Sequence, residues 1–168
     1  MPTQEKASES SSERNILDLL KQDHEKARYL FDRIGKSGKK TTANLQNLFS
    51  ELEEELGVHM EGEERFFYSA LEQHEEARAK ILEAYEEHQV IKMLLGTFKS
   101  LAVDDERWGA KIKVLNDVIE HHLKEEEGEI FTLARKELDR NQMLEMAVQF
   151  MRNKREGRKP LRGAPVEG

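Results

Sequence analysis

Two halves of the chain repeat one pattern of histidine and glutamate. Each half contains a single histidine, a long gap and then a His-x-x-x-Glu motif. The six residues are His24, His59 and Glu63 in the first half, and His88, His122 and Glu126 in the second. Equivalent residues of the two halves are 63 or 64 positions apart. Imidazole and carboxylate groups repeated in this way are typical of metal ligands.

The spacing within each motif brings its two side chains together. Residues four apart on an α-helix project from one face, about one turn apart, so both can reach the same buried point. The duplicated unit therefore supplies four imidazoles and two carboxylates, which is a ligand set for two metal ions. Mixed nitrogen and oxygen ligands without sulfur suit iron, manganese or zinc. Two carboxylates placed to bridge two ions favour a dinuclear centre.

Each of these six residues interrupts an apolar helical face. His24 lies in line with Leu20 and Ala27, His88 with Ile91, and the two His-x-x-x-Glu motifs continue similar stripes. A carboxylate on such a face is costly to bury without a compensating charge. A single histidine there is more often a hydrogen-bonded core residue than a ligand. Four histidines in register, two of them followed by glutamate, favour metal binding.

A second histidine–glutamate pair lies directly beside one of the motifs. His121 and Glu125 are also four apart, but they share a face with acidic residues and a glycine, which is typical of a solvent-facing surface. His122 and Glu126 lie on the apolar face and keep the repeat spacing, so we predict these two as ligands. We expect His121 to be exposed or to lie outside the ligand set. His74, in the turn QHEEAR, is predicted to be a surface residue.

The composition excludes several classes of protein. The 168 residues are enough for one domain with a buried core, and the absence of cysteine excludes disulfides and thiolate metal sites, which fits the cytoplasm. No stretch approaches the roughly 20 apolar residues that span a membrane, and the polar N-terminus lacks the apolar core of a signal peptide. The net charge of −7 argues against nucleic-acid binding.

The order of expected helices indicates an all-α protein. Good helix formers dominate and proline is absent between residues 15 and 151, so we predict an up-down-up-down four-helix bundle with a short C-terminal fifth helix and disordered ends. The second helix contains two glycines near the ligand turn, Gly57 and Gly62, and a glycine there is expected to let a neighbouring backbone approach closely. Helices are expected over 15–34, 42–72, 75–101 and 104–138, and a short one over 142–152. The predicted divisions are a disordered segment 1–13, a bundle 14–139, a short helical region 140–153 and a basic flexible tail 154–168.

Four segments carry a resemblance to a known family. They are DHEKARYLF around His24, HMEGEERFFYSAL around His59, EEHQVIKMLL around His88 and HHLKEEEGEIF around His122. Over about residues 15–138 the chain resembles the hemerythrin-like family, the HHE cation-binding domain. The resemblance implies two non-haem iron ions with an oxo or hydroxo bridge inside the bundle. It implies that His24 and His59 bind one iron, that His88 and His122 bind the other, and that Glu63 and Glu126 bridge them.

The chain departs from the oxygen-carrying hemerythrins at two positions. Those proteins have a fifth histidine on the third helix, whereas here the positions four away from His88 are Ala84 and Lys92. Their last helix also carries an aspartate where this chain has Glu126. An iron with one protein ligand fewer offers an open position to a small molecule or to another side chain. Three tyrosines are candidates by their chemistry, namely Tyr29, Tyr68 and Tyr85.

These features leave several functions open. The favoured one is a di-iron protein that binds dioxygen, nitric oxide or peroxide as a store, scavenger or sensor, with no protein partner indicated. The alternative is a redox enzyme that decomposes peroxide or handles nitric oxide, although no general acid or base stands out beyond the ligands. Iron storage or delivery is a weaker alternative. A structural role for zinc or manganese in the same ligands is a further one.

Overall fold

The computed structural model describes residues 14–36 and 41–157, and every regular element in these ranges is helical. Three long rods are single or nearly single helices: α1 (Ile16–Lys36), α4 (Glu75–Thr97) with the short η2 (Phe98–Ser100), and α7 (Arg140–Gly157). Two further rods change their helical pitch along their length. They consist of α2 (Thr42–Gly62), η1 (Glu63–Tyr68) and α3 (Ser69–Leu71), and of α5 (Glu106–Glu125), η3 (Glu126–Ile130) and α6 (Phe131–Glu137).

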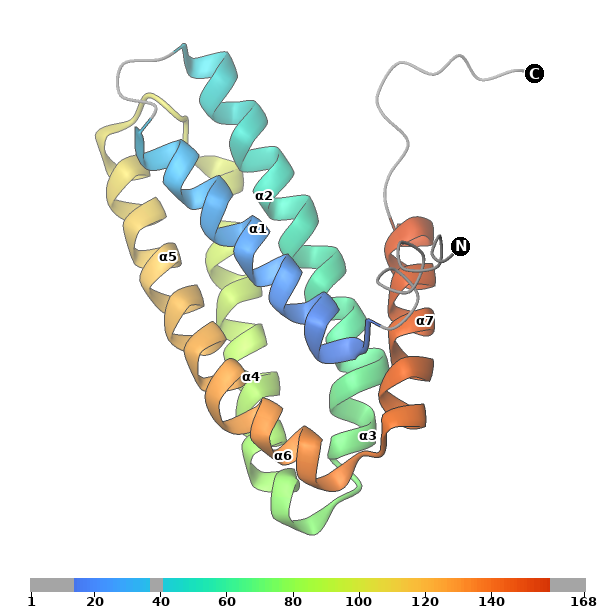
Figure 1. The fold of residues 1–168 in the computed structure, drawn as a ribbon. Coiled ribbons are helices and arrows are strands. Elements are labelled where there is room, and N and C mark those ends of the chain that lie inside the picture. Colours follow the sequence, from blue (N-terminus) through green and yellow to red (C-terminus); the bar gives the residue numbers. More distant parts are fainter. Residues whose placement is uncertain (1–13, 37–40, 158–168) are drawn as a thin grey trace, which may run out of the picture.

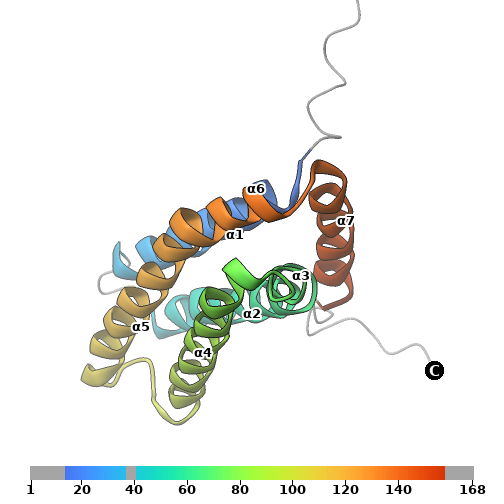
Figure 2. The same ribbon diagram turned by 90° about the horizontal axis from the view of Figure 1, so that it is seen from below.

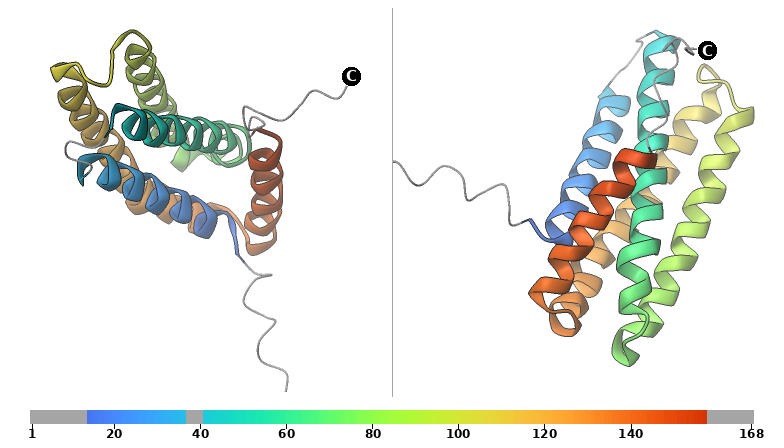
Figure 3. Two further views of the ribbon diagram at one scale, coloured as in Figure 1. Left: turned by 90° about the horizontal axis from the view of Figure 1, so that it is seen from above. Right: turned by 90° about the vertical axis from the view of Figure 1, so that its right-hand side faces the viewer.

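Four of these rods form an up-down-up-down bundle. The rods that begin with α1, α2, α4 and α5 run side by side in Figure 1 and surround a common centre when viewed along their length in Figure 2. The fifth rod, α7, lies outside this group and packs against α1 and α2, as both views in Figure 3 show. The predicted all-α bundle with an additional C-terminal helix is therefore confirmed.

Side-chain caps determine where several helices begin. The carboxylate of Asp105 accepts a hydrogen bond from the backbone N–H of Arg107 at 2.9 Å, so Asp105 caps α5, and this helix begins slightly later than the expected range 104–138. The carboxylate of Asp139 accepts from the backbone N–H of Gln142 at 2.8 Å, and the Gln142 side chain accepts from the backbone N–H of Asp139 at 2.9 Å. This capping box begins α7 at Arg140, two residues before the expected start of the short C-terminal helix at 142.

The last helix is longer than its sequence pattern predicted. It extends to Gly157, so Lys154 and Arg155 lie in a helix and not in the basic tail to which we had assigned them. Residues 158–168 of that tail, the N-terminal segment 1–13 and residues 37–40 lie outside the described residues. Among the helices that are described, none is long and apolar enough to cross a bilayer.

The apolar core is divided into two clusters with a polar layer between them. One cluster includes Leu20, Phe67 and Phe150, and the other includes Phe49 and Trp108. Seven polar side chains are buried among the described residues: His24, His59, Glu63, His88, His122, Glu126 and Asn153. Six of these seven are the predicted metal ligands. The packing of the bundle thus concentrates its buried polarity where the sequence repeat placed it.

Candidate metal centre

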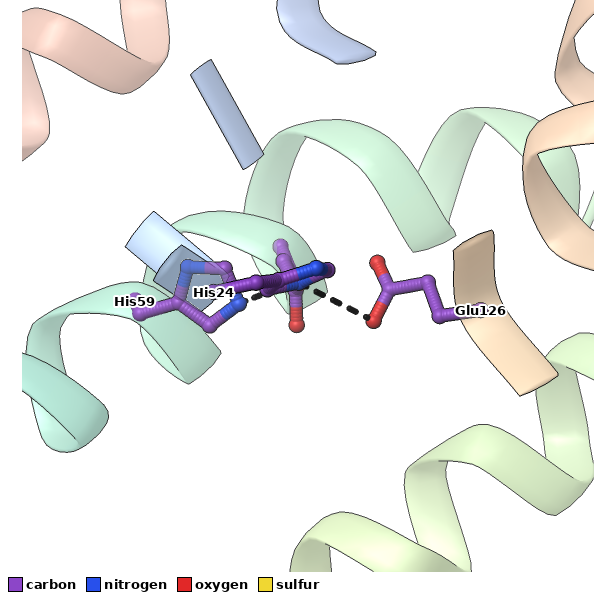
Figure 4. A group of neighbouring side chains, drawn as sticks. His24, His59 and Glu126 are labelled. Atoms are coloured by element: carbon purple, nitrogen blue, oxygen red, sulfur yellow. Dashed lines mark ion pairs between the residues drawn. The ribbon is translucent and has the colours of Figure 1, made fainter. Parts of the chain in front are cut away.

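All six predicted ligand residues converge at the middle of the bundle. None of them is more than 6% exposed. His24 comes from α1, His59 from α2, Glu63 from the start of η1, His88 from α4, His122 from α5 and Glu126 from the start of η3. Figure 4 shows His24 and His59 close together, with Glu126 directed toward them from the opposite rod. Residues far apart in the sequence therefore form one cluster.

The first half-site consists of His24 and His59 with the two glutamates. The Nε2 atom of His59 lies 2.7 Å from Oε1 of Glu63. The Nε2 atom of His24 lies 3.8 Å from the same oxygen and 3.8 Å from Oε2 of Glu126. Each of the four residues offers a ligand atom within 4.8 Å of the others. This spacing suits a single ion held by two imidazoles and two carboxylates.

The second half-site consists of His88 and His122 and shares the glutamates. The Nε2 atom of His88 lies 3.1 Å from Oε2 of Glu63 and 3.1 Å from Nε2 of His122. The Nε2 atom of His122 lies 3.2 Å from Oε2 of Glu126. Glu63 thus directs one oxygen toward each half-site, which is the arrangement that a bridging carboxylate requires.

Several atoms of the cluster make no hydrogen bond of good geometry despite their closeness. They are Nε2 of His24 and of His59, both carboxylate oxygens of Glu63, and Oε1 of Glu126. A buried polar atom without a partner costs about 1–3 kcal/mol, so five of them at one place would strongly destabilise the fold. Cations between the half-sites would give all of these atoms partners. The donor set therefore fits metal ions.

The electrostatics of the cluster point the same way. Burial alone would raise the pKa of the Glu63 carboxyl, but the neighbouring histidines, above all His59, hold that pKa well below its usual range. Burial and the charge of Glu63 raise the pKa of Glu126. Burial alone would lower the pKa of His122, but the neighbouring carboxylates of Glu126 and Glu87 outweigh this effect and raise that pKa to about 10. The two buried carboxylates require positive charge, which protons on the histidines supply when no cation does.

Each ligand glutamate begins a π-helical turn. Glu63 is the first residue of η1, and Glu126 is the first residue of η3. A π-helical turn contains an extra residue and is frequent at functional sites, because it redirects the side chains that follow. The residues five positions beyond the glutamates are Tyr68 and Phe131, and both contact ligand histidines. The two halves therefore repeat a backbone irregularity as well as a sequence motif.

Those two aromatic residues differ by a hydroxyl group. Phe131 stacks on His24, with ring centroids 6.1 Å apart and an angle of 17° between the rings. Tyr68 lies beside His88 at 5.1 Å. The Tyr68 hydroxyl is 3.4 Å from Nε2 of His88 and of His122 and donates to Oε2 of Glu126 at 3.3 Å. Of the three candidate tyrosines, Tyr68 is the one that reaches the centre.

The other two tyrosines lie away from the cluster. Tyr29 is 54% exposed, and its hydroxyl accepts a hydrogen bond from the Arg33 guanidinium at 2.8 Å. The Tyr85 hydroxyl donates to the backbone carbonyl of Glu64 at 3.4 Å. The two remaining histidines also lie outside it, as predicted: His74 is partly exposed and pairs with a glutamate of α6, and His121 is largely exposed.

Carboxylates outside the cluster hold the second ring nitrogen of three ligand histidines. The Nδ1 atom of His24 is 2.9 Å from Glu127, that of His59 is 2.9 Å from Asp23, and that of His88 is 2.9 Å from Glu64. Such contacts fix the tautomer and orientation of a metal-binding imidazole and increase its basicity. The outer carboxylates are therefore part of the site.

A cation supports each of these three outer carboxylates. Arg28 donates to Glu127 at 2.9 Å, Lys92 pairs with Glu64 at 2.7 Å, and Lys154 pairs with Asp23. The contact with His24 and the positive charge of Arg28 lower the pKa of Glu127 to about 2, although partial burial opposes the shift. Three ligand histidines are thus held by a chain of imidazole, carboxylate and cation.

Sequence reasoning overlooked the outer carboxylates, although the repeat contains them. An acidic residue precedes the single histidine of each half, as Asp23 and Glu87, and another follows the motif glutamate, as Glu64 and Glu127. The acidic residue before the single histidine contacts the motif histidine of its own half, as in the pairs Asp23–His59 and Glu87–His122. The acidic residue after the motif glutamate contacts the single histidine of the other half, as in the pairs Glu64–His88 and Glu127–His24. A pattern of acid–His and His-x-x-x-Glu–acid, read in both halves, would have found them.

Helix α7 closes the first half-site from outside. The ring of Phe150 lies edge-on to His59 at 6.1 Å. A Cβ atom on Gly62 would lie 2.6 Å from that ring, so only glycine leaves room for it. The expected close approach at Gly62 therefore exists, but the neighbour is an aromatic side chain and not a backbone. Lys154 from the same helix reaches Asp23, as described above.

The fold and the buried cluster define a metal-binding helical bundle. The family described as "Hemerythrin HHE cation binding domain" matches residues 15–134. The chain belongs to the hemerythrin HHE cation-binding domain family, as its sequence motifs predicted.

Three similar proteins illustrate this membership. The chain is 26% identical over 136 residues to a protein named DNA nickase from Nostoc sp., and the match covers 81% of the chain but only 38% of that relative. It is 29% identical over 143 residues to an uncharacterized hemerythrin-like protein from Schizosaccharomyces pombe, covering 83% of the chain and 69% of the relative. A crystal structure of an HHE domain-containing protein from Mycobacterium kansasii has the same fold, with a TM-score of 0.70, 21% identity and coverage of 85% and 89% of the two chains.

Proposed function

We propose that this protein holds a non-haem di-iron centre that binds dioxygen, nitric oxide or peroxide. The observation that supports it most strongly is the position of Glu63, whose two oxygens face the two half-sites. His24 and His59 would hold one iron, and His88 and His122 would hold the other. Glu63 and Glu126 would bridge the pair, together with an oxo or hydroxo group from solvent. Iron suits these nitrogen and oxygen ligands, as do manganese and zinc.

The protein environment supports the binding of a small molecule at the second half-site. The fifth histidine of oxygen-carrying hemerythrins is absent here, because Ala84 and Lys92 stand four positions from His88. The Tyr68 hydroxyl lies close to both histidines of this half-site. Burial and the charges of Glu126 and Glu63 raise the pKa of Tyr68 well above 10, so the phenol keeps its proton. A bound di-iron pair would supply the electrons for dioxygen or peroxide chemistry, while Tyr68 offers a hydrogen-bond donor at that place.

Spectroscopy of the iron-loaded protein tests this function. We expect the absorption bands of an oxo-bridged di-iron centre to bleach on anaerobic reduction and to return or shift on addition of dioxygen, nitric oxide or peroxide. Zinc-loaded protein is the control, because zinc has no redox chemistry. A reduced di-iron protein whose spectrum responds to none of the three molecules would contradict the proposal.

Ligand variants test the assignment of the six residues. We expect His59→Ala and His122→Ala to lose metal from the buried centre, because each removes one of two imidazoles from a half-site. His74→Ala is the matched control, since His74 pairs with one carboxylate outside the cluster. Retention of two irons per chain by His122→Ala would show that the ligand set is wrong.

The second candidate is a redox enzyme that decomposes peroxide or handles nitric oxide. The Tyr68 hydroxyl favours it, because a proton held 3.3 Å from Glu126 could be passed to a reacting oxygen atom. Repeated peroxide consumption with gas evolution, weakened in Tyr68→Phe, would move the assignment from binding to catalysis. A single binding event per centre would support the first function. Iron storage or delivery remains the weaker alternative.

Two further expectations accompany the proposal. We expect the protein in the cytoplasm, and we expect no nucleic-acid binding because the net charge is −7. One relative bears the name DNA nickase, but the chain spans only 38% of its length. Gel-shift measurements with nicked and intact duplex DNA at low salt would test the second expectation, and a retarded band would contradict it.

A further inference from the structure

One of the four buried histidines, His122, has an outer carboxylate contact that differs from those of the other three. Glu87 is the repeat equivalent of Asp23, and it faces Nδ1 of His122. The distance is 3.4 Å, compared with 2.9 Å at the other three histidines. Lys154, Lys92 and Arg28 support the other outer carboxylates, but no lysine or arginine among the described residues forms an ion pair with Glu87. Among the described residues, the outer carboxylate beside His122 therefore has no lysine or arginine partner.

Two further side chains that could bind a metal ion lie close to Glu87. Glu87, His121 and Glu125 each offer a ligand atom, and these atoms lie within 4.8 Å of one another. His121 and Glu125 are one turn apart on α5, with Nε2 of the histidine 3.3 Å from Oε1 of the glutamate. The other oxygen of Glu125 pairs with Lys80 at 2.9 Å, so Oε1 remains directed toward His121.

A buried atom of the centre points at the same place. His122 is only 3% exposed, and its Nδ1 atom makes no hydrogen bond of good geometry. The carboxylate that this atom faces is Glu87, which also belongs to the surface cluster. Glu87 therefore lies between a buried ligand histidine and an exposed one. This contact connects the surface cluster to the second half-site.

We propose that Glu87, His121 and Glu125 form a third metal site, which holds a divalent transition-metal ion at the surface and loads the buried centre. One imidazole and two carboxylates suit zinc, manganese or ferrous iron. The ion would take the place of the missing cation and draw the Glu87 carboxylate into the position that the other three carboxylates occupy. His121 is 68% exposed and lets an ion arrive from solvent. The loading role rests on the proposed buried centre, whereas the surface site does not.

Equilibrium dialysis of the metal-free full chain against zinc tests the site. We expect three zinc ions per chain in the unaltered protein and two in His121→Ala. His74→Ala is the matched control and should keep three, because His74 has a glutamate neighbour but belongs to no such cluster. His59→Ala should lose zinc from the buried centre and keep the surface ion. Equal zinc content in His121→Ala and the unaltered protein would overturn the surface site.

The pattern of losses separates this proposal from the function proposed above. Two ions in both the unaltered protein and His121→Ala would contradict the surface site and leave the dinuclear centre intact. One ion in the unaltered protein and none in His121→Ala would contradict the buried centre and support the surface site.

The loading role has its own measurement. With a colorimetric zinc chelator as donor, stopped-flow mixing should show slower filling of the buried centre in His121→Ala than in His74→Ala. The final occupancy of the two buried positions should be the same in both variants. Equal filling rates in the two variants would overturn the loading role.

Discussion

The two proposed half-sites of this protein have the same types of candidate ligand but different surroundings. The first, with His24 and His59, has both outer carboxylates at 2.9 Å, and each carboxylate is paired with a cation. It also lies beneath α7. The second, with His88 and His122, has one such carboxylate, one looser contact and a tyrosine hydroxyl. The difference therefore lies in what holds the histidines: two carboxylate–cation pairs at the first half-site, but one such pair and the looser Glu87 contact at the second.

If the proposed centre forms, this difference would give the two halves separate tasks. Imidazoles held by a carboxylate and a cation lose little freedom when they bind a metal ion, so the first half-site should bind its ion more tightly. The looser half, with Tyr68 and the surface cluster, is the place where ions and small molecules would enter and leave. A duplicated sequence thus supports an asymmetric centre.

The largest effect is expected from removing Glu63, whose two oxygens face different half-sites. Glu63→Ala should lose both metal ions, because each half-site loses a carboxylate oxygen and the bridge disappears. Glu61→Ala is the matched control, since Glu61 lies two residues earlier, is half exposed and pairs with Arg65. Metal analysis after purification measures the result. Full occupancy in Glu63→Ala would show that the halves do not share this carboxylate.

Removal of both metal ions should lower the melting temperature. The metal-free bundle must keep Glu63 and Glu126 in its core without the ions that bind only the folded state. Calorimetry before and after chelation measures the change, and restored stability on adding metal back is the control. A metal-free form that melts at the same temperature would contradict a buried dinuclear site.

Removal of an outer carboxylate should weaken metal binding more at the first half-site than at the second. Asp23→Ala should weaken metal binding at the first half-site by roughly 10–100-fold, as for other residues that orient ligand histidines. Glu87→Ala should weaken the second half-site less, because its contact with His122 is 3.4 Å. Competition with a chelator of known affinity gives both values. A larger loss in Glu87→Ala would reverse the comparison.

Substitution of Gly62 should test how tightly α7 packs beside the first half-site. Gly62→Ala should destabilise the fold by about 1–3 kcal/mol, because the added methyl group overlaps the ring of Phe150, which is fully buried. Gly57→Ala is the control on the same helix, where nothing lies within 4 Å, and should stabilise by up to about 1 kcal/mol. Chemical denaturation measures both. Equal stabilities for the two variants would show that α7 is loosely packed here.

The smallest effect is expected from exchanging the aromatic residues that distinguish the halves. Tyr68→Phe should retain both metal ions but change the visible spectrum of the iron-loaded protein, because an oxygen atom near the second half-site is lost. Phe131→Tyr, which adds a hydroxyl near His24, is the complementary variant. Unchanged spectra in both would mean that the hydroxyl does not contribute to the environment of the metal.

The sequence predicted the six residues of the buried cluster because their signal is local and repeated. Two motifs with helical spacing on apolar faces are sufficient to predict a buried site, and the all-α bundle follows from the same periodicity. The outer carboxylates were missed, because an acidic residue beside a histidine resembles any solvated helix face. Asp23 and Lys154 are 131 positions apart, so their contact depends on how α7 packs against the bundle.

The π-helical turns explain why Tyr68 could not be singled out from the sequence. Tyr68 follows Glu63 by five positions, and residues three or four apart are those that share a face on an α-helix. The hydrogen bonds of a π-helical turn join residues five apart, and η1 spans this interval. The helical periodicity of the sequence does not show such a turn, so three tyrosines remained equivalent until the structure was known.

The central claim is that the two half-sites hold a pair of iron ions, and metal analysis combined with absorption spectroscopy tests it most directly. The account predicts two irons per chain in iron-loaded protein, with oxo-bridged di-iron bands that bleach on reduction. One iron per chain, a preference for zinc under the same loading conditions, or no bound metal would contradict it.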